Sequence, residues 1–287
     1  MKKKKNITNF ILIGIMVIGL CVLAYPKVSD WWNSFHQTRA IASYVEQVSE
    51  MDKEEIDRMW AEAEAYNVRL RAKPNRYIMS DAEEAEYNSI LDVTGTGIMG
   101  YIDINKIHVS YPLYHGTDEA VLQIAIGHIA GSSLPVGGIG THSQLSGHRG
   151  LPSAKLFSDI DQLEVGDRFM VQVLDRTMTY EVDQIRIVLP TELQDLEIDD
   201  NEDYCTLITC TPYGVNTHRL LVRGHRVENE AEADVTADAM RFEPYIIAPL
   251  VAAPILMVLL IMLLVSTGRG RQKRAFLDLK RGRGDAR

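Results

Sequence analysis

Two uncharged apolar runs near the ends of this 287-residue chain limit its fold more than any other feature. The first run covers residues 10–25 and the second covers residues 245–265. A helix that crosses a bilayer needs about 20 apolar residues and tolerates roughly 17. The second run is long enough alone, and the first is long enough with its flanks. The first run also lacks the small-x-small pattern of a signal-peptide cleavage site. We therefore predict two uncleaved transmembrane helices.

Basic residues flank both runs and predict how the chain lies in the membrane. Four lysines, Lys2–Lys5, precede the first run, and eight basic residues follow the second. Cationic flanks stay in the cytoplasm, so we expect both termini to be cytoplasmic and residues 27–243 to be extracellular. That external segment carries 18 basic and 37 acidic residues, which argues against a nucleic acid partner.

The cysteines of the external segment predict neither a disulfide nor a metal site. Cys205 and Cys210 fall on opposite faces of a strand because their spacing is odd, and they lie about 16 Å apart. That separation is far beyond the reach of a disulfide. It also prevents a zinc site built from both thiols with His218 and His225. We therefore predict free thiols, no metal and no cofactor.

The external segment divides into a helical part and a strand-rich part. Residues 31–71 carry apolar stripes at helical spacing, interrupted where Asp52 and Glu55 fit a capping box. After Pro74, residues 75–97 are polar with weak periodicity and are interpreted as a surface loop. From Gly100 onward, short β-branched and aromatic runs alternate with turn residues, leaving room for short helices at 118–127 and 154–163. This pattern of short strands and turns predicts an antiparallel barrel or sandwich.

Cys210 is the candidate nucleophile, because it ends a strand immediately before a Pro-Tyr-Gly turn. Side chains at strand ends often meet substrate, but a small buried core thiol is an equally good interpretation. Hairpin pairing across the turn brings Arg219 toward Cys210, where a guanidinium suits an oxyanion. His148 follows an apolar strand and two small residues, Ser146 and Gly147, which leave room for a ligand backbone. A solvated arginine and a structural histidine are the alternatives for these two residues.

The stretches "TLITCTPYGVNTHRLLVRGHR", "SGHRGLPSAKLF" and "GSSLPVGG" resemble the sortases, and among them the pilus-building class C. The resemblance covers roughly residues 97–227, and both apolar runs fit that group. It implies an all-β-dominated fold, namely an eight-stranded β-barrel with short helices, an N-terminal helical segment and two transmembrane helices. It also implies that Cys210 is the nucleophile, that His148 is the proton carrier and that Arg219 holds the oxyanion.

The activity implied by this resemblance is transpeptidation at the cell membrane of a Gram-positive bacterium, with the catalytic domain outside. Cys210 would attack the Thr–Gly carbonyl of an LPxTG-like sorting signal, and the thioester would pass to a lysine of a pilin subunit. The implied partners are therefore pilins or surface proteins with such signals. The alternatives are a wall-anchoring sortase, which acylates a cell-wall peptide amine, and a membrane-anchored barrel without catalytic activity.

The sequence differs from its class C relatives at the lid, a loop over the active site in which those relatives carry an Asp-Pro-aromatic motif. The comparable stretch here is "MSDAEEAEY", in which Asp81 could supply the carboxylate for Arg219 but Ala82 and Glu83 replace the proline and the ring. The expected domains are a basic N-terminus with an anchor (1–26), a helical segment with a lid-like loop (27–96), a catalytic barrel (97–228), an acidic linker (229–243), a second span (244–266) and a basic cytoplasmic tail (267–287).

Overall fold

The computed structural model describes residues 2–229, with side chains from residue 13 onward. The predicted acidic linker, second span and basic tail lie outside these residues, apart from residue 229. The helices are α1 (Lys2–Glu50), α2 (Lys53–Arg71), α3 (Asp81–Ser89) and α4 (Glu119–Leu122), with short 3-10 helices η1 (Asn105–Ile107), η2 (Leu156–Gln162) and η3 (Gln194–Leu196). The strands are β1 (Ile98–Ile104), β2 (Val109–His115), β3 (Ile126–His128), β4 (Thr141–Ser146), β5 (Arg168–Val173), β6 (Arg176–Val188), β7 (Asp203–Thr211) and β8 (His218–Val227).

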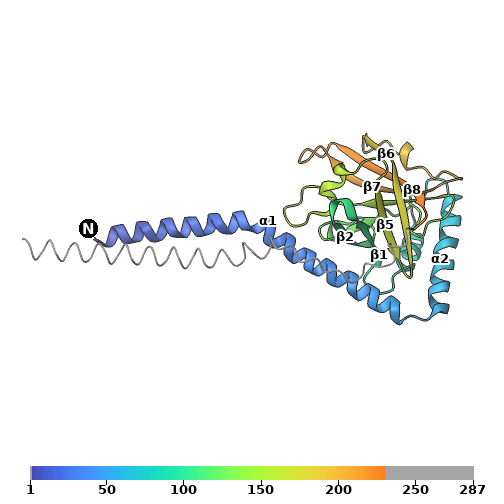
Figure 1. The fold of residues 1–287 in the computed structure, drawn as a ribbon, viewed down its shortest axis with the longest axis horizontal. Helices are drawn as coiled ribbons and strands as arrows, with labels where there is room; N and C mark the ends of the chain where they lie inside the picture. The colour runs from blue at the N-terminus through green and yellow to red at the C-terminus, as the bar shows by residue number, and fades with distance from the viewer. Residues whose placement is uncertain (1, 230–287) are drawn as a thin grey trace, which may run out of the picture. The chain divides into compact units, whose positions relative to one another are not determined.

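These eight strands of the described chain form a closed barrel in the order β1-β2-β3-β4-β7-β8-β6-β5 (Figure 1). The predicted barrel is thus confirmed, but its purely antiparallel character is wrong. The pairs β2–β3 and β4–β7 are parallel, and the other neighbouring pairs are antiparallel. Sequence analysis also missed β3, because a strand of three residues is too short to show a period of two.

Side chains alternate between the barrel interior and its outer face, as the strand period requires. Along β7 the interior positions include Cys205 and Leu207, both fully buried with Val222 of β8 and Phe169 of β5. The alternate residues Thr206, Ile208 and Cys210 lie on the other face of the strand. Because the interior is filled with side chains, ligands have access only to the outer face and the ends of this barrel.

The helical segment packs against the barrel, and its predicted break is confirmed. α1 ends at Glu50, and the Asp52 carboxylate accepts a hydrogen bond of 2.8 Å from the backbone N–H of Glu55 at the start of α2. The predicted stripe residues Tyr44 and Trp60 are buried. The Tyr44 hydroxyl donates to the Met99 carbonyl in β1, so α1 is fixed to the barrel by a buried hydrogen bond as well as by packing.

The predicted surface loop at 75–97 is wrong for its central part, which is helix α3. Ser80 caps this helix reciprocally: its hydroxyl accepts from the N–H of Glu83, and its own N–H donates to the Glu83 carboxylate at 2.7 Å. Tyr87 is buried, with its hydroxyl donating to the His128 carbonyl and accepting from the Gly116 N–H. The cap and this single buried ring stabilise the helix, and neither produces a long apolar stripe.

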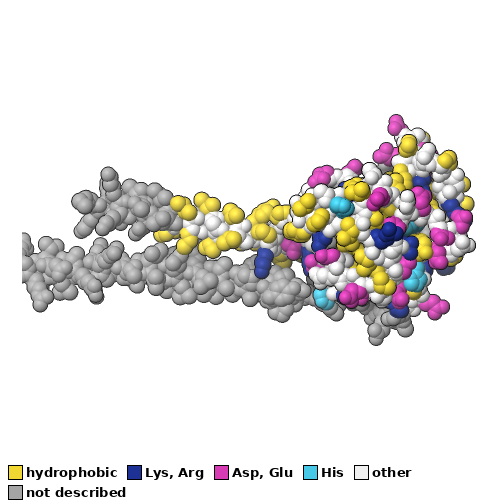
Figure 2. Space-filling view, turned by 90° about the horizontal axis from the view of Figure 1, so that it is seen from above, with side chains coloured by type: hydrophobic (Ala, Val, Ile, Leu, Met, Phe, Trp, Pro, Cys, Tyr) yellow, Lys and Arg dark blue, Asp and Glu magenta, His cyan; other side chains and the backbone are white. Residues whose placement is uncertain are grey.

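Within the described residues, one helix is long and apolar enough to cross a membrane, over residues 13–50. Its apolar side chains are exposed where it extends from the barrel, with Leu23 78% exposed and Val22 67% exposed, and Figure 2 shows them on the visible face of the helix. Burial in lipid would remove this surface from water. The predicted second span lies outside the described residues.

Candidate active site

Cys210 lies near the end of β7 on the outer face of the barrel and is partly exposed. Cys205 lies on the opposite face and is fully buried, so the predicted placement of the two thiols is confirmed. Burial raises the pKa of the Cys205 thiol, because an apolar interior disfavours the charged thiolate. Of these two thiols, only Cys210 is accessible to a substrate.

Arg219 is the direct partner of Cys210 in the antiparallel pair β7–β8, as the hairpin argument predicts. Its guanidinium donates hydrogen bonds to the backbone carbonyls of Asn216 at 3.3 Å and His218 at 3.1 Å. Asn216 belongs to the turn that joins the two strands, and His218 is the first residue of β8. Their carbonyls therefore hold the guanidinium at the start of β8, while most of its five donors stay available.

His148 follows β4, which is the parallel neighbour of β7. The preceding residue Gly147 is fixed twice to β7: its N–H donates to the Ile208 carbonyl at 3.1 Å, and its carbonyl accepts from the Thr209 hydroxyl at 2.7 Å. The imidazole is about one-third exposed, and its Nε2 lies 3.9 Å from a carboxylate oxygen of Glu119 in α4.

Arg149 fixes the loop after His148 to the end of β7. It donates to the Thr211 hydroxyl at 3.3 Å and pairs with the Asp161 carboxylate. Only 11% of its side chain is exposed. Sequence reasoning missed Arg149 and Glu119, because their partners are distant in the chain; the one available signal was that Arg149 directly follows the candidate histidine.

Asp81, the residue predicted to face Arg219, is the first residue of α3 and is exposed. In the described part of the chain, Arg219 forms no ion pair with any carboxylate, and its hydrogen bonds go to the two carbonyls named above. The structure therefore pairs Cys210 with Arg219 in the strand register and places His148 in the loop after β4, the strand next to β7. It does not bring Asp81 to Arg219.

The loop between β6 and β7 covers the outer face of the barrel next to Cys210. Leu196 of η3 is buried there against Ile208 of β7, Leu221 of β8 and Val188 of β6. Ile208 precedes Cys210 by two residues on the same face, and Leu221 follows Arg219 by two. This small apolar cluster is therefore the immediate neighbour of the thiol and the guanidinium.

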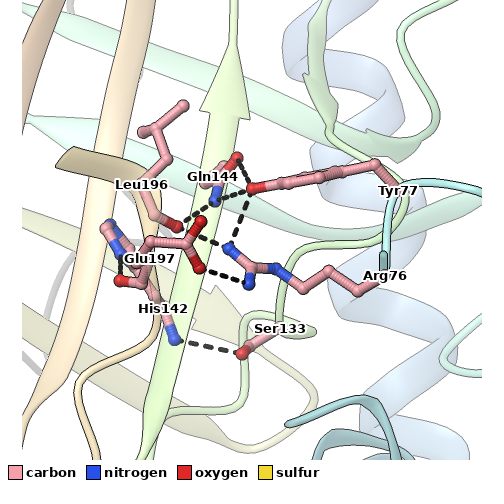
Figure 3. Close-up of polar contacts among 7 residues, drawn as sticks. All are labelled: Arg76, Tyr77, Ser133, His142, Gln144, Leu196 and Glu197. Carbon is pink, nitrogen blue, oxygen red and sulfur yellow. Dashed lines mark hydrogen bonds and ion pairs between the residues drawn. The ribbon is translucent and has the colours of Figure 1, made fainter. Parts of the chain in front are cut away.

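Polar side chains fasten this loop to β4 and to the segment before α3 (Figure 3). Arg76 donates to the Glu197 carboxylate at 2.9 Å and to the Leu196 carbonyl at 2.8 Å. The same carbonyl accepts from the amide of Gln144 in β4 at 2.9 Å, and that amide also donates to the Tyr77 hydroxyl at 2.8 Å. The stretch preceding Asp81 is thus fastened to the β6–β7 loop.

His142 of β4 completes this network as a neutral imidazole. Its Nδ1 donates to the Glu197 carbonyl at 2.8 Å, and its Nε2 accepts from the Thr206 hydroxyl at 2.7 Å. Burial lowers the pKa of His142 to about 4, since charging the ring there would cost solvation. Burial likewise lowers the pKa of His128 to about 3.

These two histidines predict that the fold loses stability in mild acid. Unfolded histidine takes up a proton near pH 6.5, whereas the folded rings resist it, so stability present above pH 6.5 is lost as the pH falls toward 4. At pH 5 each ring costs about 2 kcal/mol of unfolding free energy. Thermal unfolding of the full chain in detergent at pH 7.5 and 5.0 measures this loss. A His142→Gln variant should lose less stability between the two pH values than the parent, and an equal loss would contradict the assignment.

The arrangement supplies a nucleophile, a proton carrier and an anion-binding donor at one end of the pair β7–β8. Among residues 13–229, no three histidine, cysteine or acidic side chains are placed to hold a metal ion. A thiol opposite an arginine in the strand register, with an imidazole in the loop after the adjoining strand, is suited to acyl transfer through a covalent intermediate.

Comparisons with known proteins agree with this geometry. The sortase domain model matches residues 102–227. A solved structure of sortase C1 from Streptococcus agalactiae is 55% identical, with a TM-score of 0.66, and covers 67% of this chain and 100% of its own. Sortase C of Streptococcus pneumoniae is 44% identical, with a TM-score of 0.61, and covers 67% of this chain and 98% of its own. Sortase A of Bacillus anthracis is 24% identical over 80% of this chain and 99% of its own length.

Proposed function

Since this chain belongs to the sortase family of cysteine transpeptidases, we propose that it joins pilin subunits by cleaving LPxTG-like sorting signals and transferring the acyl group to a pilin lysine. The observation that carries this proposal is the pairing of Cys210 with Arg219 on the outer face. The solved class C relatives support the pilin substrate: the S. pneumoniae structure is described in terms of pilin substrate specificity, and that of Clostridium perfringens sortase C contains a C-terminal cell wall sorting motif.

Cys210 would begin the reaction as a thiolate, which is the nucleophilic form of cysteine. Its sulfur attacks the carbonyl carbon of the Thr–Gly bond and forms a tetrahedral intermediate. Arg219 donates hydrogen bonds to the oxygen that becomes negative there. Its position opposite Cys210 in the strand register suits that role.

His148, as an imidazolium, would protonate the glycine amine as the Thr–Gly bond breaks, leaving a thioester on Cys210. The incoming lysine amine then attacks the thioester, loses its proton to His148 and restores the thiolate. Because one imidazole serves both amines, the leaving and incoming groups approach the same side of the acyl carbon. Glu119, whose carboxylate oxygen lies 3.9 Å from His148 Nε2, would help to position the imidazole.

The apolar part of α1 supports a membrane location. Our proposal is that residues 1–26 form the anchor, that residues 27–96 and the barrel at 97–228 lie outside the cell, and that a linker at 229–243 leads to a second span at 244–266 and a cytoplasmic tail at 267–287. The basic flanks carry this orientation.

Mass spectrometry of the product tests the proposed reaction. The full chain in detergent would be incubated with one pilin domain that ends in an LPxTG-like signal and another that offers a lysine. We expect a mass of 32.3 kDa plus the acyl fragment on the enzyme, followed by a branched product joined at lysine. A product formed only with cell-wall peptide amines would favour the wall-anchoring alternative. A chain that never becomes acylated would exclude both.

Arg76→Ala is expected to loosen the β6–β7 loop and to raise the KM for the sorting signal several-fold with a smaller change in kcat. The buried guanidinium donates hydrogen bonds to the Glu197 carboxylate and to the Leu196 carbonyl, and the Leu196 side chain belongs to the apolar cluster beside Cys210. Losing hydrogen bonds that involve a charged group costs about 1.5–3 kcal/mol each.

Hydrogen exchange over residues 190–200 measures the same loosening without any substrate. Arg69→Ala is the matched control, because it removes an ion pair between α2 and α3, with Glu86, that lies away from this loop. Equal exchange in the two variants would contradict a fastening role for Arg76.

A further inference from the structure

A cavity of about 810 Å3 lies between residues 26–30 of α1, which directly follow the apolar stretch, and the loop that follows His148. Lys27 and Asp30 of α1 line one side, and Lys155 and Gln162 line the other. Gly150 and Tyr213 line the part of the cavity that is nearest to the catalytic residues in sequence: Gly150 is two residues after His148, and Tyr213 is in the turn between Cys210 and Arg219.

Hydrogen bonds hold the two walls of this cavity together. The Asp30 carboxylate accepts from the backbone N–H of Lys155 at 3.0 Å, and the Asn33 amide donates to the Ser153 carbonyl at 2.8 Å. The helix that carries the apolar stretch is therefore bonded directly to the loop that carries His148. Hydrogen bonds therefore fix both walls of the cavity, one formed by α1 and the other by this loop.

Two close contacts place the wall of the cavity next to the catalytic end of the barrel. The Gly150 Cα lies so near the Tyr213 ring that an added Cβ would meet ring atoms at 2.9 Å. Arg149 lines the cavity, lies 6.0 Å from the Tyr213 ring centroid and donates to the Thr211 hydroxyl next to Cys210. A group that leaves the acyl carbon on the His148 side therefore has this cavity as its neighbour.

The chemistry of the proposed reaction says what must occupy that side. His148 protonates the leaving amine and deprotonates the incoming one, so both amines, with the polypeptides that carry them, occupy the His148 side in turn. The lining suits a polar polypeptide, because it consists largely of charged groups: Arg149 pairs with Asp161, Lys155 pairs with Asp159, and Lys27 and Asp30 face them from α1. Such a lining can pair with charged side chains of either sign and with main-chain amides.

We propose that this cavity is the amine-side subsite of the enzyme, which binds the residues after the Thr–Gly bond and then the segment that carries the acceptor lysine. The inference rests on the proposed function and adds a second polypeptide-binding site to it. Residues of the N-terminal helix, Lys27 and Asp30, thereby become part of substrate recognition. An occupant that enters from Cys210 leaves the cavity where α1 emerges from its apolar stretch.

Two peptides test the subsite with the full chain in detergent. One ends as an amide directly after the glycine of the motif, and the other continues for five further polar residues. The extended peptide should acylate Cys210 about tenfold faster in kcat/KM, the gain expected from one well-formed contact region. Gln162→Trp, which narrows the cavity at its exposed rim, should remove this advantage and leave the rate with the short peptide unchanged.

Val165→Trp is the matched control, since Val165 is 67% exposed in the turn after η2 and does not line the cavity. This variant should keep the advantage of the extended peptide. A benzophenone on the third residue after the glycine should crosslink to residues 150–162, which gives a readout independent of any variant. Equal rates for the two peptides, or crosslinks elsewhere, would overturn the subsite. Failure of both peptides to acylate Cys210 would overturn the proposed function and the subsite with it.

Discussion

Replacing Cys210 by alanine is expected to abolish thioester formation completely and to leave the fold intact. The reaction has no covalent intermediate without the sulfur, and no other thiol of the barrel can replace it, because Cys205 is buried on the opposite face. The thiol of Cys210 is partly exposed on the outer face, so its removal leaves no cavity in the core. Acylation by a sorting peptide, followed by mass spectrometry, measures the loss.

Cys205→Ala is the control for this prediction. Its side chain is fully buried beside Leu207 and Val222, so truncation should lower the unfolding temperature by the cost of a small cavity and leave acylation unchanged. Turnover retained in Cys210→Ala, or lost in Cys205→Ala without unfolding, would assign the nucleophile to another residue.

Arg219→Lys is expected to lower kcat by about 100-fold or more although the positive charge is kept. Arginine can hold the two carbonyls of the turn and still present further donors to the oxyanion, because its guanidinium carries five N–H groups in a rigid fork. A lysine ammonium is a point charge on a flexible stem and cannot do both. Removal of a single oxyanion donor costs about 100- to 1000-fold in kcat elsewhere.

Arg223→Lys is the matched comparison on the same strand and the same face. Its guanidinium is held by both carboxylate oxygens of Asp183, at 3.1 and 2.6 Å, so it has a structural partner already. We expect this variant to lose some stability and to keep most of its turnover. If Arg219→Lys turned over normally and Arg223→Lys did not, the anion-binding role would pass to Arg223.

The catalytic end of the barrel was predictable because its signals are local. The Pro-Tyr-Gly turn joins two strands of period two, so the hairpin register follows from sequence and places Arg219 opposite Cys210. The break between α1 and α2 was predictable for a similar reason, since Asp52 and its partner Glu55 are only three residues apart.

The features that sequence reasoning missed depend on contacts between distant segments. Helix α3 is stabilised by one buried ring, Tyr87, which bonds to residues about 30 and 40 positions away. Arg76 and Glu197, which fasten the loop beside the site, are separated by 121 positions. Contacts between residues so far apart produce no periodic pattern in the sequence. The parallel pairing of β4 with β7, which brings His148 to Cys210, also requires the closed barrel.

Helix α1 has a consequence for the geometry of any substrate held in the same bilayer as the enzyme. Helical rise places Asp30 and Asn33, the residues bonded to the His148 loop, about 8 and 12 Å beyond Tyr25, where the apolar stretch ends. A continuous helix fixes this height, whereas a disordered tether would let the catalytic domain sample many heights. An extended polypeptide covers about 12 Å with four residues. If the apolar stretch lies in lipid and the proposed function holds, a Thr–Gly bond closer than about four residues to the membrane surface would therefore not reach Cys210.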